Sequence, residues 1–223
     1  MKLITSLTLL IYLILASFGF CQKRIHIDEK GDTIGQSQFL EKWRNKDLGL
    51  SRWDSIGKDK KRYATLRSNL YTAGNIDYTT IKTEIEKITP LKFNDSSIII
   101  LQYYYKDDLC SSKSDNLWTK KEINSRKNFI NPLIKDYRKH NIIFISLFEN
   151  GIKLNTNSKN EEEYFFLDVN NFAKENIFTS QTLCGSFAAI KPNGQILIRN
   201  GEYRVDLFEQ HLKPENWSLF FNN

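Results

Sequence analysis

Short amphipathic patterns dominate the chain up to residue 90. Residues 24–28 (Arg-Ile-His-Ile-Asp) alternate polar and apolar side chains, which predicts a half-buried strand. Apolar residues then recur at spacings of three and four, the period of a helix face. They predict three helices, built on Phe39, Leu40 and Trp43; on Tyr63, Leu66 and Leu70; and on Ile81, Ile85 and Ile88. A loop through Gly49 and Gly57 joins the first two, and Pro90 ends the third. We therefore expect residues 22–90 to form a mostly helical N-terminal extension.

From residue 97 the pattern changes to long apolar runs separated by amphipathic helices. Ser97–Tyr105 is a continuous apolar and aromatic run, which is typical of a strand buried on both faces. Residues 119–122 (Thr-Lys-Lys-Glu) form a capping box that opens a helix. Pro132 lies inside this helix, which predicts either a kink or a new helix with Asn131 as its cap. Residues 142–147 (Ile-Ile-Phe-Ile-Ser-Leu) predict a second buried strand.

The last part of the chain contains a hairpin. Residues 164–168 predict a short strand or the lead into a helix over 170–176. Ser186–Ile190 and Gln195–Arg199 flank the turn signal Pro192-Asn193-Gly194, and Asn-Gly between two such runs is a strong hairpin signal. A final helix carries Val205, Phe208 and Leu212 and stops before Pro214.

The element order from residue 97 is therefore β-α-β-α-β-β-α. Two strands joined through a long helix are expected to be parallel, with a right-handed crossover. The Asn-Gly hairpin must be antiparallel. The sequence thus predicts an α/β fold with a mixed sheet and helices on both of its faces.

Composition and charge narrow the function classes. The chain has 223 residues, 40% of them hydrophobic and 26% charged, with a net charge of +6. A globular core is therefore expected. The basic residues are interleaved with acidic ones, as in residues 58–62 (Lys-Asp-Lys-Lys-Arg), whereas nucleic-acid binders concentrate them on one face. We expect no nucleic-acid partner.

The N-terminus has the pattern of an export signal. Lys2 precedes an apolar run over residues 7–15, and the small residues Ala16, Ser17 and Gly19 follow. A cut after Cys21 would remove residues 1–21 and leave a periplasmic or extracellular protein without integral membrane contact. An uncleaved membrane anchor and a lipoprotein attached through Cys21 are the alternatives. The high content of Asn, Lys and Ile is typical of an AT-rich bacterial genome.

Some residues after position 95 resemble the thioredoxin-like superfamily, and in particular the exported bacterial thiol-disulfide proteins. Phe129–Ile134, with Pro132 inside, is similar to the proline-kinked first helix of that family. Cys184–Ile196 is similar to its late strand, turn and return strand. The resemblance covers about residues 95–213 and implies a thioredoxin-like domain over residues 91–223.

The sequence departs from this family at its redox motif. Family members that carry out redox chemistry have Cys-x-x-Cys at the start of the kinked helix, but here the sequence reads Cys110-Ser111-Ser112-Lys113. Gly185 or Ser186 stands where the family has a cis-proline that lines the active site. The resemblance therefore implies Lys113, Gly185 and Ser186 as active-site-loop candidates and puts ordinary dithiol exchange in doubt.

The cysteines give the sharpest structural expectation. The chain has three, and removal of Cys21 with the signal leaves Cys110 and Cys184. Cys110 follows one central strand and Cys184 precedes another, and the resemblance makes those places neighbours in the sheet. We expect a disulfide between them. If the pair is redox-active instead, the same two cysteines are the catalytic residues.

The acidic residues and the histidines were also considered as metal or cofactor ligands. Asp107, Asp108 and Asp115 form an acidic loop that could bind Ca²⁺ or act as acid and base, against the simpler interpretation of a solvated loop. The three histidines, His26, His140 and His211, lie far apart and lack metal-ligand spacing. We expect neither a metal nor a cofactor.

Three functions follow from these observations. The first is an exported thioredoxin-like protein with a binding or structural role in the cell envelope. The second is a thiol-disulfide oxidoreductase that uses Cys110, Cys184 or both. The third is a secreted module that binds a protein partner through residues 22–90.

Overall fold

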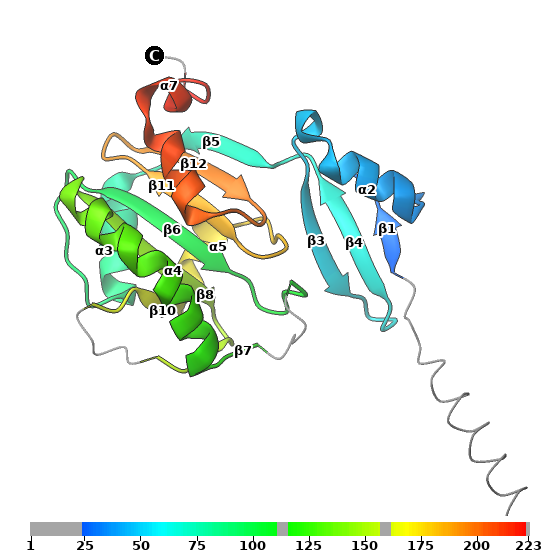
Figure 1. Cartoon of the computed structure of the whole chain (residues 1–223), viewed down its shortest axis with the longest axis horizontal. Helices are drawn as coiled ribbons and strands as arrows, with labels where there is room; N and C mark the ends of the chain where they lie inside the picture. The colour runs from blue at the N-terminus through cyan, green and yellow to red at the C-terminus, as the bar shows by residue number, and fades with distance from the viewer. Residues whose placement is uncertain (1–23, 111–115, 157–161, 222–223) are drawn as a thin grey trace, which may run out of the picture.

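A computed structural model of the chain describes residues 24–110, 116–156 and 162–221. These residues form two sheets that lie next to each other (Figure 1). A four-stranded sheet is built from the N-terminal residues, and a six-stranded sheet from most of the rest. None of the described helices is long and apolar enough to cross a bilayer.

The N-terminal sheet has the strand order β2-β1-β4-β3. Its strands are β1 (Ile25–Ile27), β2 (Thr33–Ile34), β3 (Ser51–Ile56) and β4 (Arg62–Arg67). β1 runs parallel to β4, and the other two pairs are antiparallel. Helix α2 (Gln36–Arg44) covers the sheet, followed by the short helix η1 (Lys46–Leu48). Phe39 of α2 packs with Leu50, Ala64 and Leu66 in a small core.

The expectation of a mostly helical N-terminal extension is wrong. The helix predicted on Tyr63, Leu66 and Leu70 is strand β4, and the predicted loop through Gly49 and Gly57 contains β3. In β4 the fully buried positions are Ala64 and Leu66, two residues apart, which is the period of a strand. The apolar spacing from Tyr63 to Leu66 fits a helix equally well, and the pairing of this segment with β1 and β3 makes it a strand.

The second sheet has the strand order β10-β8-β6-β11-β12-β5. The strands are β5 (Tyr71–Asn75), β6 (Ile98–Tyr104), β8 (Ile142–Glu149), β10 (Phe165–Asp168), β11 (Ser186–Ile190) and β12 (Gln195–Asn200). β6, β8 and β10 are parallel, whereas β11, β12 and β5 alternate in direction. The predicted parallel pair joined by a long helix, the antiparallel hairpin and the mixed sheet are confirmed.

Helices cover both faces of this sheet, as predicted. On one face α3 (Tyr78–Ile88) and α5 (Phe172–Asn176) pack onto a core centred on β6 and β8. On the other face lie α4 (Lys120–Lys139), α6 (Val205–Phe208) and the C-terminal turns. Those turns are η2 (Glu209–Leu212) and α7 (Pro214–Trp217), and a short parallel pair, β7 (Leu117–Trp118) with β9 (Lys153–Leu154), completes the elements.

The capping box at the start of α4 is present. The amide of Glu122 donates to the hydroxyl of Thr119, and the Glu122 carboxylate accepts from the Thr119 amide at 2.8 Å. Pro132 lies within one uninterrupted helix, so no second helix starts at Asn131. The Asn131 side chain instead accepts a hydrogen bond from the Tyr164 hydroxyl at 2.7 Å.

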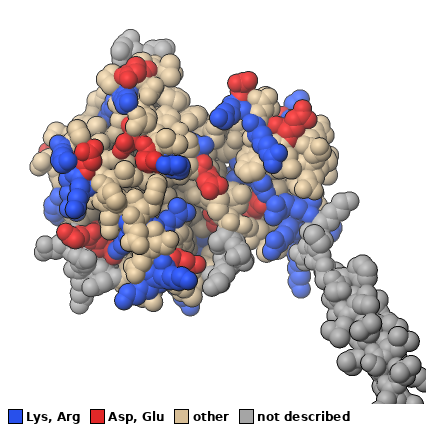
Figure 2. All heavy atoms as spheres, in the orientation of Figure 1, with Lys and Arg blue, Asp and Glu red and all other residues tan. Residues whose placement is uncertain are grey.

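The two halves of the chain share the second sheet. β5 pairs with β12, and Ile81 and Ile85 of α3 are buried in the core of that sheet, although both elements precede residue 91. The division of the chain into domains at residue 91 stays a prediction. On the face shown in Figure 2, basic and acidic side chains lie beside one another over both sheets.

Candidate functional site

A disulfide joins Cys110 to Cys184, as expected from the sequence. β11 lies antiparallel to β6, with Ser186 opposite Tyr103, so the end of β6 meets the start of β11. The segment after β6 carries Cys110 and the segment before β11 carries Cys184, with 5.0 Å between their Cα atoms. Cys110 is exposed and Cys184 is half-buried, which leaves the bond at the surface of the molecule.

The carboxylate of Asp108 connects the backbones of both cysteines. Its Oδ1 accepts from the amide of Cys110 and its Oδ2 from the amide of Cys184, each at 2.9 Å. The pKa of Asp108 is raised from 3.8 to about 6, mainly by burial and to a smaller extent by the nearby Asp54 and Glu202 carboxylates, while the two amides oppose the shift. A partly desolvated acid therefore lies against the disulfide.

The predicted acidic loop is described only in part. Asp107 exchanges hydrogen bonds with the side chain of Asn116, and Asp115 lies outside the described residues. Within the described ranges, His, Cys, Asp and Glu side chains form no group that could hold a metal ion. Of the two described aspartates, Asp108 is the one that contacts the disulfide segment.

The backbone at Cys184 and Gly185 turns through the left-handed region. Their φ angles are +64° and +84°. A Cβ atom at position 185 would overlap the carbonyl oxygen of Tyr103, so only glycine fits there without a backbone shift. The glycine is therefore needed to bring Cys184 to the end of β6.

Ser186 belongs to a buried polar network under the disulfide. Its hydroxyl lies 2.7 Å from Thr182 Oγ1 and 3.2 Å from the Tyr105 hydroxyl, and it donates to Asn200 Oδ1 at 3.3 Å. The Thr182 hydroxyl also accepts from the amide of Gly201 at 3.0 Å. These bonds fix the segment that carries Cys184, and among its members only Ser186 was singled out from the sequence.

The N-terminal sheet packs onto the same segment. The amide of Leu183 donates to the carbonyl of Arg52 in β3 at 2.7 Å, and Arg67 in β4 donates to the carbonyl of Gln181 at 2.9 Å. Trp53 of β3 meets Tyr105 edge to face, with 6.1 Å between ring centroids. The two hydrogen bonds join residues more than a hundred positions apart, and no sequence pattern indicated them.

Among the described helices, none begins at either cysteine. Cys110 lies well before Thr119, the N-cap of α4, so it does not occupy a helix N-terminus. Lys113, the predicted loop cation, lies outside the described residues. Cys184 lies in a turn that leads into a strand rather than a helix.

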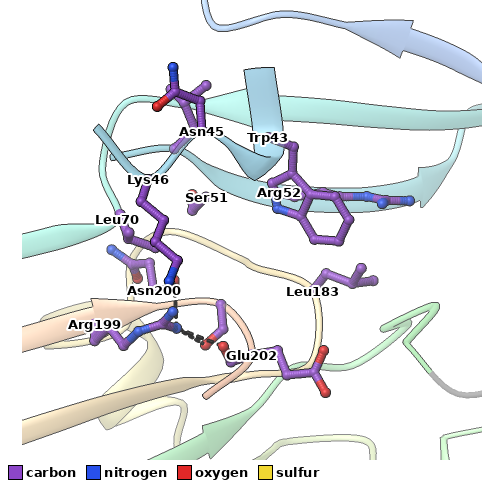
Figure 3. A pocket seen from close by; sticks show the side chains of 12 residues that line it. Trp43, Asn45, Lys46, Ser51, Arg52, Leu70, Leu183, Arg199, Asn200 and Glu202 are labelled. Atoms are coloured by element: carbon purple, nitrogen blue, oxygen red, sulfur yellow. Dashed lines mark hydrogen bonds between the residues drawn. The ribbon is translucent and has the colours of Figure 1, made fainter. Parts of the chain in front are cut away.

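Two cavities lie on either side of the disulfide segment. One, of about 370 Å³, contacts Cys184 and is lined by Arg126, Phe129 and Ile130 of α4, by residues 202–205 and by Leu207. The other, of about 210 Å³, lies between the two sheets (Figure 3). Leu183 lines the second cavity, and Glu202 lines both.

The histidines are not brought together. His26 packs on Phe39, and His140 contacts the Asp136 carbonyl. His211 lies near the Tyr71 hydroxyl, with 3.2 Å between its Nε2 and the hydroxyl oxygen. Each histidine thus has a local structural contact.

Comparisons with known proteins find similarity only to solved structures, and at low sequence identity. No family model matches the sequence, and no curated protein matches it. A search of solved structures finds the exposed lipoprotein thioredoxin Etrx1 of Streptococcus pneumoniae, which is 12% identical, with 73% of this chain and 98% of that chain covered and a TM-score of 0.37.

Two further structures are similar in the same way. The N-terminal domain of PilB from Neisseria gonorrhoeae is 11% identical, with 56% of this chain and 80% of that chain covered and a TM-score of 0.37. DsbF of MTB is 9% identical, with 52% and 79% covered and a TM-score of 0.32. At these values the functional argument rests on the strand order and on the site itself.

Proposed function

We propose that the chain is an exported thioredoxin-like protein with a binding or structural role in the cell envelope, in which the Cys110–Cys184 disulfide is a structural clamp. The observation that carries this proposal is the position of the bond. It ties the end of β6 to the segment on which the N-terminal sheet packs. The bond therefore supports the contact between the two sheets.

The energetics of loop closure support a structural role. The two cysteines are 74 residues apart, and a cross-link over such a loop stabilises a fold by about 4 kcal/mol in the chain-entropy model. The hydrogen bonds that the two cysteine amides donate to Asp108 add local order on both sides of the disulfide. Neither cysteine has a second cysteine at the spacing that a thiol-disulfide exchange motif uses.

Export is proposed from the N-terminal pattern together with the disulfide. A disulfide persists in an oxidising compartment, and residues 1–21 have the pattern of a cleavable signal. N-terminal sequencing of the protein recovered from the producing cell tests this. A mature chain that begins at Gln22 supports cleaved export, whereas an intact N-terminus or a lipid on Cys21 contradicts it.

An insulin-reduction assay tests the structural role of the disulfide. The oxidised mature protein should give no turnover above the dithiothreitol background, and the variants Cys110→Ser and Cys184→Ser should match it. The same variants should unfold at a lower denaturant concentration than the wild type. We expect their free energy of unfolding to be lower by about 2–4 kcal/mol. Turnover that depends on either cysteine would overturn the proposal.

A second candidate, a thiol-disulfide oxidoreductase, is favoured by the exposure of Cys110 and by the cavity beside Cys184. Reduction by a dithiol would take up two electrons and two protons, leaving two thiols here and a disulfide on the dithiol. The reduction potential separates the two functions. A structural bond is expected below about −300 mV, while an exchanging one lies higher.

A further inference from the structure

The cavity between the two sheets has a built, asymmetric lining (Figure 3). Its walls come from the end of α2 and η1, from β3, from the segment that carries Cys184 and from the end of β12. Binding sites are common at the junction of two structural units. A volume of about 210 Å³ lies below the range of drug-sized pockets and suits a ligand the size of an amino acid.

One end of this cavity is cationic. Lys46 points toward Arg199 in Figure 3, and both side chains line the cavity. Arg199 donates through one nitrogen to the carbonyls of Gly201 at 2.9 Å and Glu202 at 2.8 Å. Among the described residues, neither Lys46 nor Arg199 has a carboxylate within ion-pair distance. Within that part of the chain, neither charge is held in an ion pair, and the Glu202 carboxylate acts on Arg199 only from a greater distance.

The charge of Arg52, by contrast, is already satisfied. Its guanidinium donates to both oxygens of the buried Asp54, at 2.6 and 2.7 Å. It also lies 4.6 Å from the ring of Trp43 and thereby supports one face of the indole. Arg52 therefore positions Trp43 rather than adding a free charge to the cavity.

The remaining lining mixes apolar with polar side chains, and the polar ones are Asn45, Ser51 and Asn200. Figure 3 shows Trp43 and Leu183 across the cavity from Lys46, with Leu70 beside Lys46, and Leu50 also lines the cavity. Glu202 lies at the edge, where its exposed carboxylate would repel a second negative charge on a ligand. The lining therefore combines a net positive end, a partly apolar wall and one repelling acid.

We propose that this cavity binds a small monocarboxylate that carries an aliphatic or aromatic group. The carboxylate lies between Lys46 and Arg199, and the apolar group lies against Trp43 and Leu183. The carboxylate belongs either to a free acid or to the C-terminus of a peptide, because both present the same chemistry. The inference concerns the oxidised protein and goes beyond the proposed structural role.

Nuclear magnetic resonance titration of the oxidised mature protein tests this site. The indole N–H signal of Trp43, assigned with the variant Trp43→Phe, reports binding. N-acetyl-leucine is the probe, and N-acetyl-leucinamide is its neutral match. We expect the acid to bind with a Kd in the millimolar range, about what a ligand of this size provides, and at least about tenfold more tightly than the amide.

Two lysine variants give the matched control. Lys46→Met removes a cavity charge, and Lys58→Met removes one from the exposed β3–β4 turn. We expect the first to weaken binding of the acid by about tenfold and the second to leave it unchanged. Arg199 is left intact, because it holds the backbone carbonyls at the end of β12.

Several results would contradict the proposed binding site. These are equal binding of acid and amide, equal effects of the two lysine variants, tighter binding of inorganic phosphate than of the acid, or no shift of the Trp43 signal at about 20 mM acid. A short peptide ending in leucine, with and without C-terminal amidation, identifies the source. Tighter binding of the free-carboxylate peptide than of N-acetyl-leucine assigns the site to a chain terminus, and weaker binding assigns it to a free acid.

Discussion

Asp108 makes the stability of the fold dependent on pH. Its pKa is raised by burial to about 6 in the folded protein, against 3.8 for an exposed aspartate. Between these two values the folded state binds a proton that the unfolded state does not. The contribution of this group to stability is therefore fully present below about pH 4 and is lost as the pH rises through 6.

The variant Asp108→Asn should remove this dependence. Between pH 4 and pH 7, we expect the free energy of unfolding of the wild type to fall by about 2 kcal/mol relative to that of the variant. Urea unfolding of the oxidised proteins across this range measures it. Asp107→Asn, which removes an exposed carboxylate from the same loop, is the control. A pH-independent difference for Asp108→Asn would show that the carboxyl is not desolvated.

Gly185 is the backbone position on which the site depends most. Alanine there would take an unfavourable left-handed conformation and would press its Cβ onto the Tyr103 carbonyl. We expect Gly185→Ala to lower the free energy of unfolding by about 3 kcal/mol. Gly201 also has a positive φ, of +93°, but a Cβ added there would meet nothing within 4 Å.

Gly201→Ala therefore separates the backbone cost from the steric one. It should cost about 1–2 kcal/mol, the conformational part alone. Urea unfolding curves of the two alanine variants, recorded side by side, make the comparison. Equal losses for both would mean that the Tyr103 carbonyl moves aside freely.

At the scale of elements, β4 connects the N-terminal sheet to the disulfide segment through Arg67. Its guanidinium donates to the carbonyl of Gln181 at 2.9 Å. Arg67→Met should loosen the segment and speed hydrogen exchange at the Leu183 amide, which donates to Arg52. Arg62→Met, on the same strand but exposed, should leave that exchange unchanged. Equal exchange in both variants would exclude Arg67 as a support of the segment.

The elements that the sequence identified correctly have patterns set by their immediate neighbours. The capping box of α4 and the Asn-Gly turn between β11 and β12 are local signals, and the mostly apolar β6 and β8 reflect burial on both faces. β4 was misassigned because Tyr63 and Leu66 are spaced for a helix, while its burial depends on β1 and β3 on either side. Tertiary contacts decided that element.

The candidate site also contains residues that the sequence indicated and residues that it did not. The sequence paired Cys110 with Cys184, because only two cysteines remain after the signal, and the disulfide confirms that pairing. Gly185 and Ser186 were singled out only by their match to the cis-proline position of the family that the sequence resembles. The partners that hold them, Tyr105, Thr182 and Asn200, have hydroxyl and amide side chains that carry no signal by themselves. Likewise, the cavity between the sheets exists only through the packing of distant segments.

At the scale of the whole molecule, the two sheets meet on the segment that the disulfide holds. Leu183 and Gln181 form hydrogen bonds with β3 and β4, respectively. Cys184 forms a hydrogen bond with Asp108 and the disulfide with Cys110. In the oxidised protein the contact surface is thus fixed from both sides. The N-terminal sheet has only a small core of its own, around Phe39 and Leu66, and it depends on this contact for stability.

Reduction of the disulfide should therefore uncouple the two sheets. In the oxidised protein we expect β3 and β4 to lose hydrogen-exchange protection at the same urea concentration as β6 and β8, as one cooperative unit. In the reduced protein β3 and β4 should lose protection first, at lower urea. Mass spectrometry of exchanged peptides measures both states, with the Cys110→Ser, Cys184→Ser double variant as a control for reductant effects. If the strands of both sheets still open together after reduction, the contact does not depend on the bond, and the disulfide acts only within the second sheet.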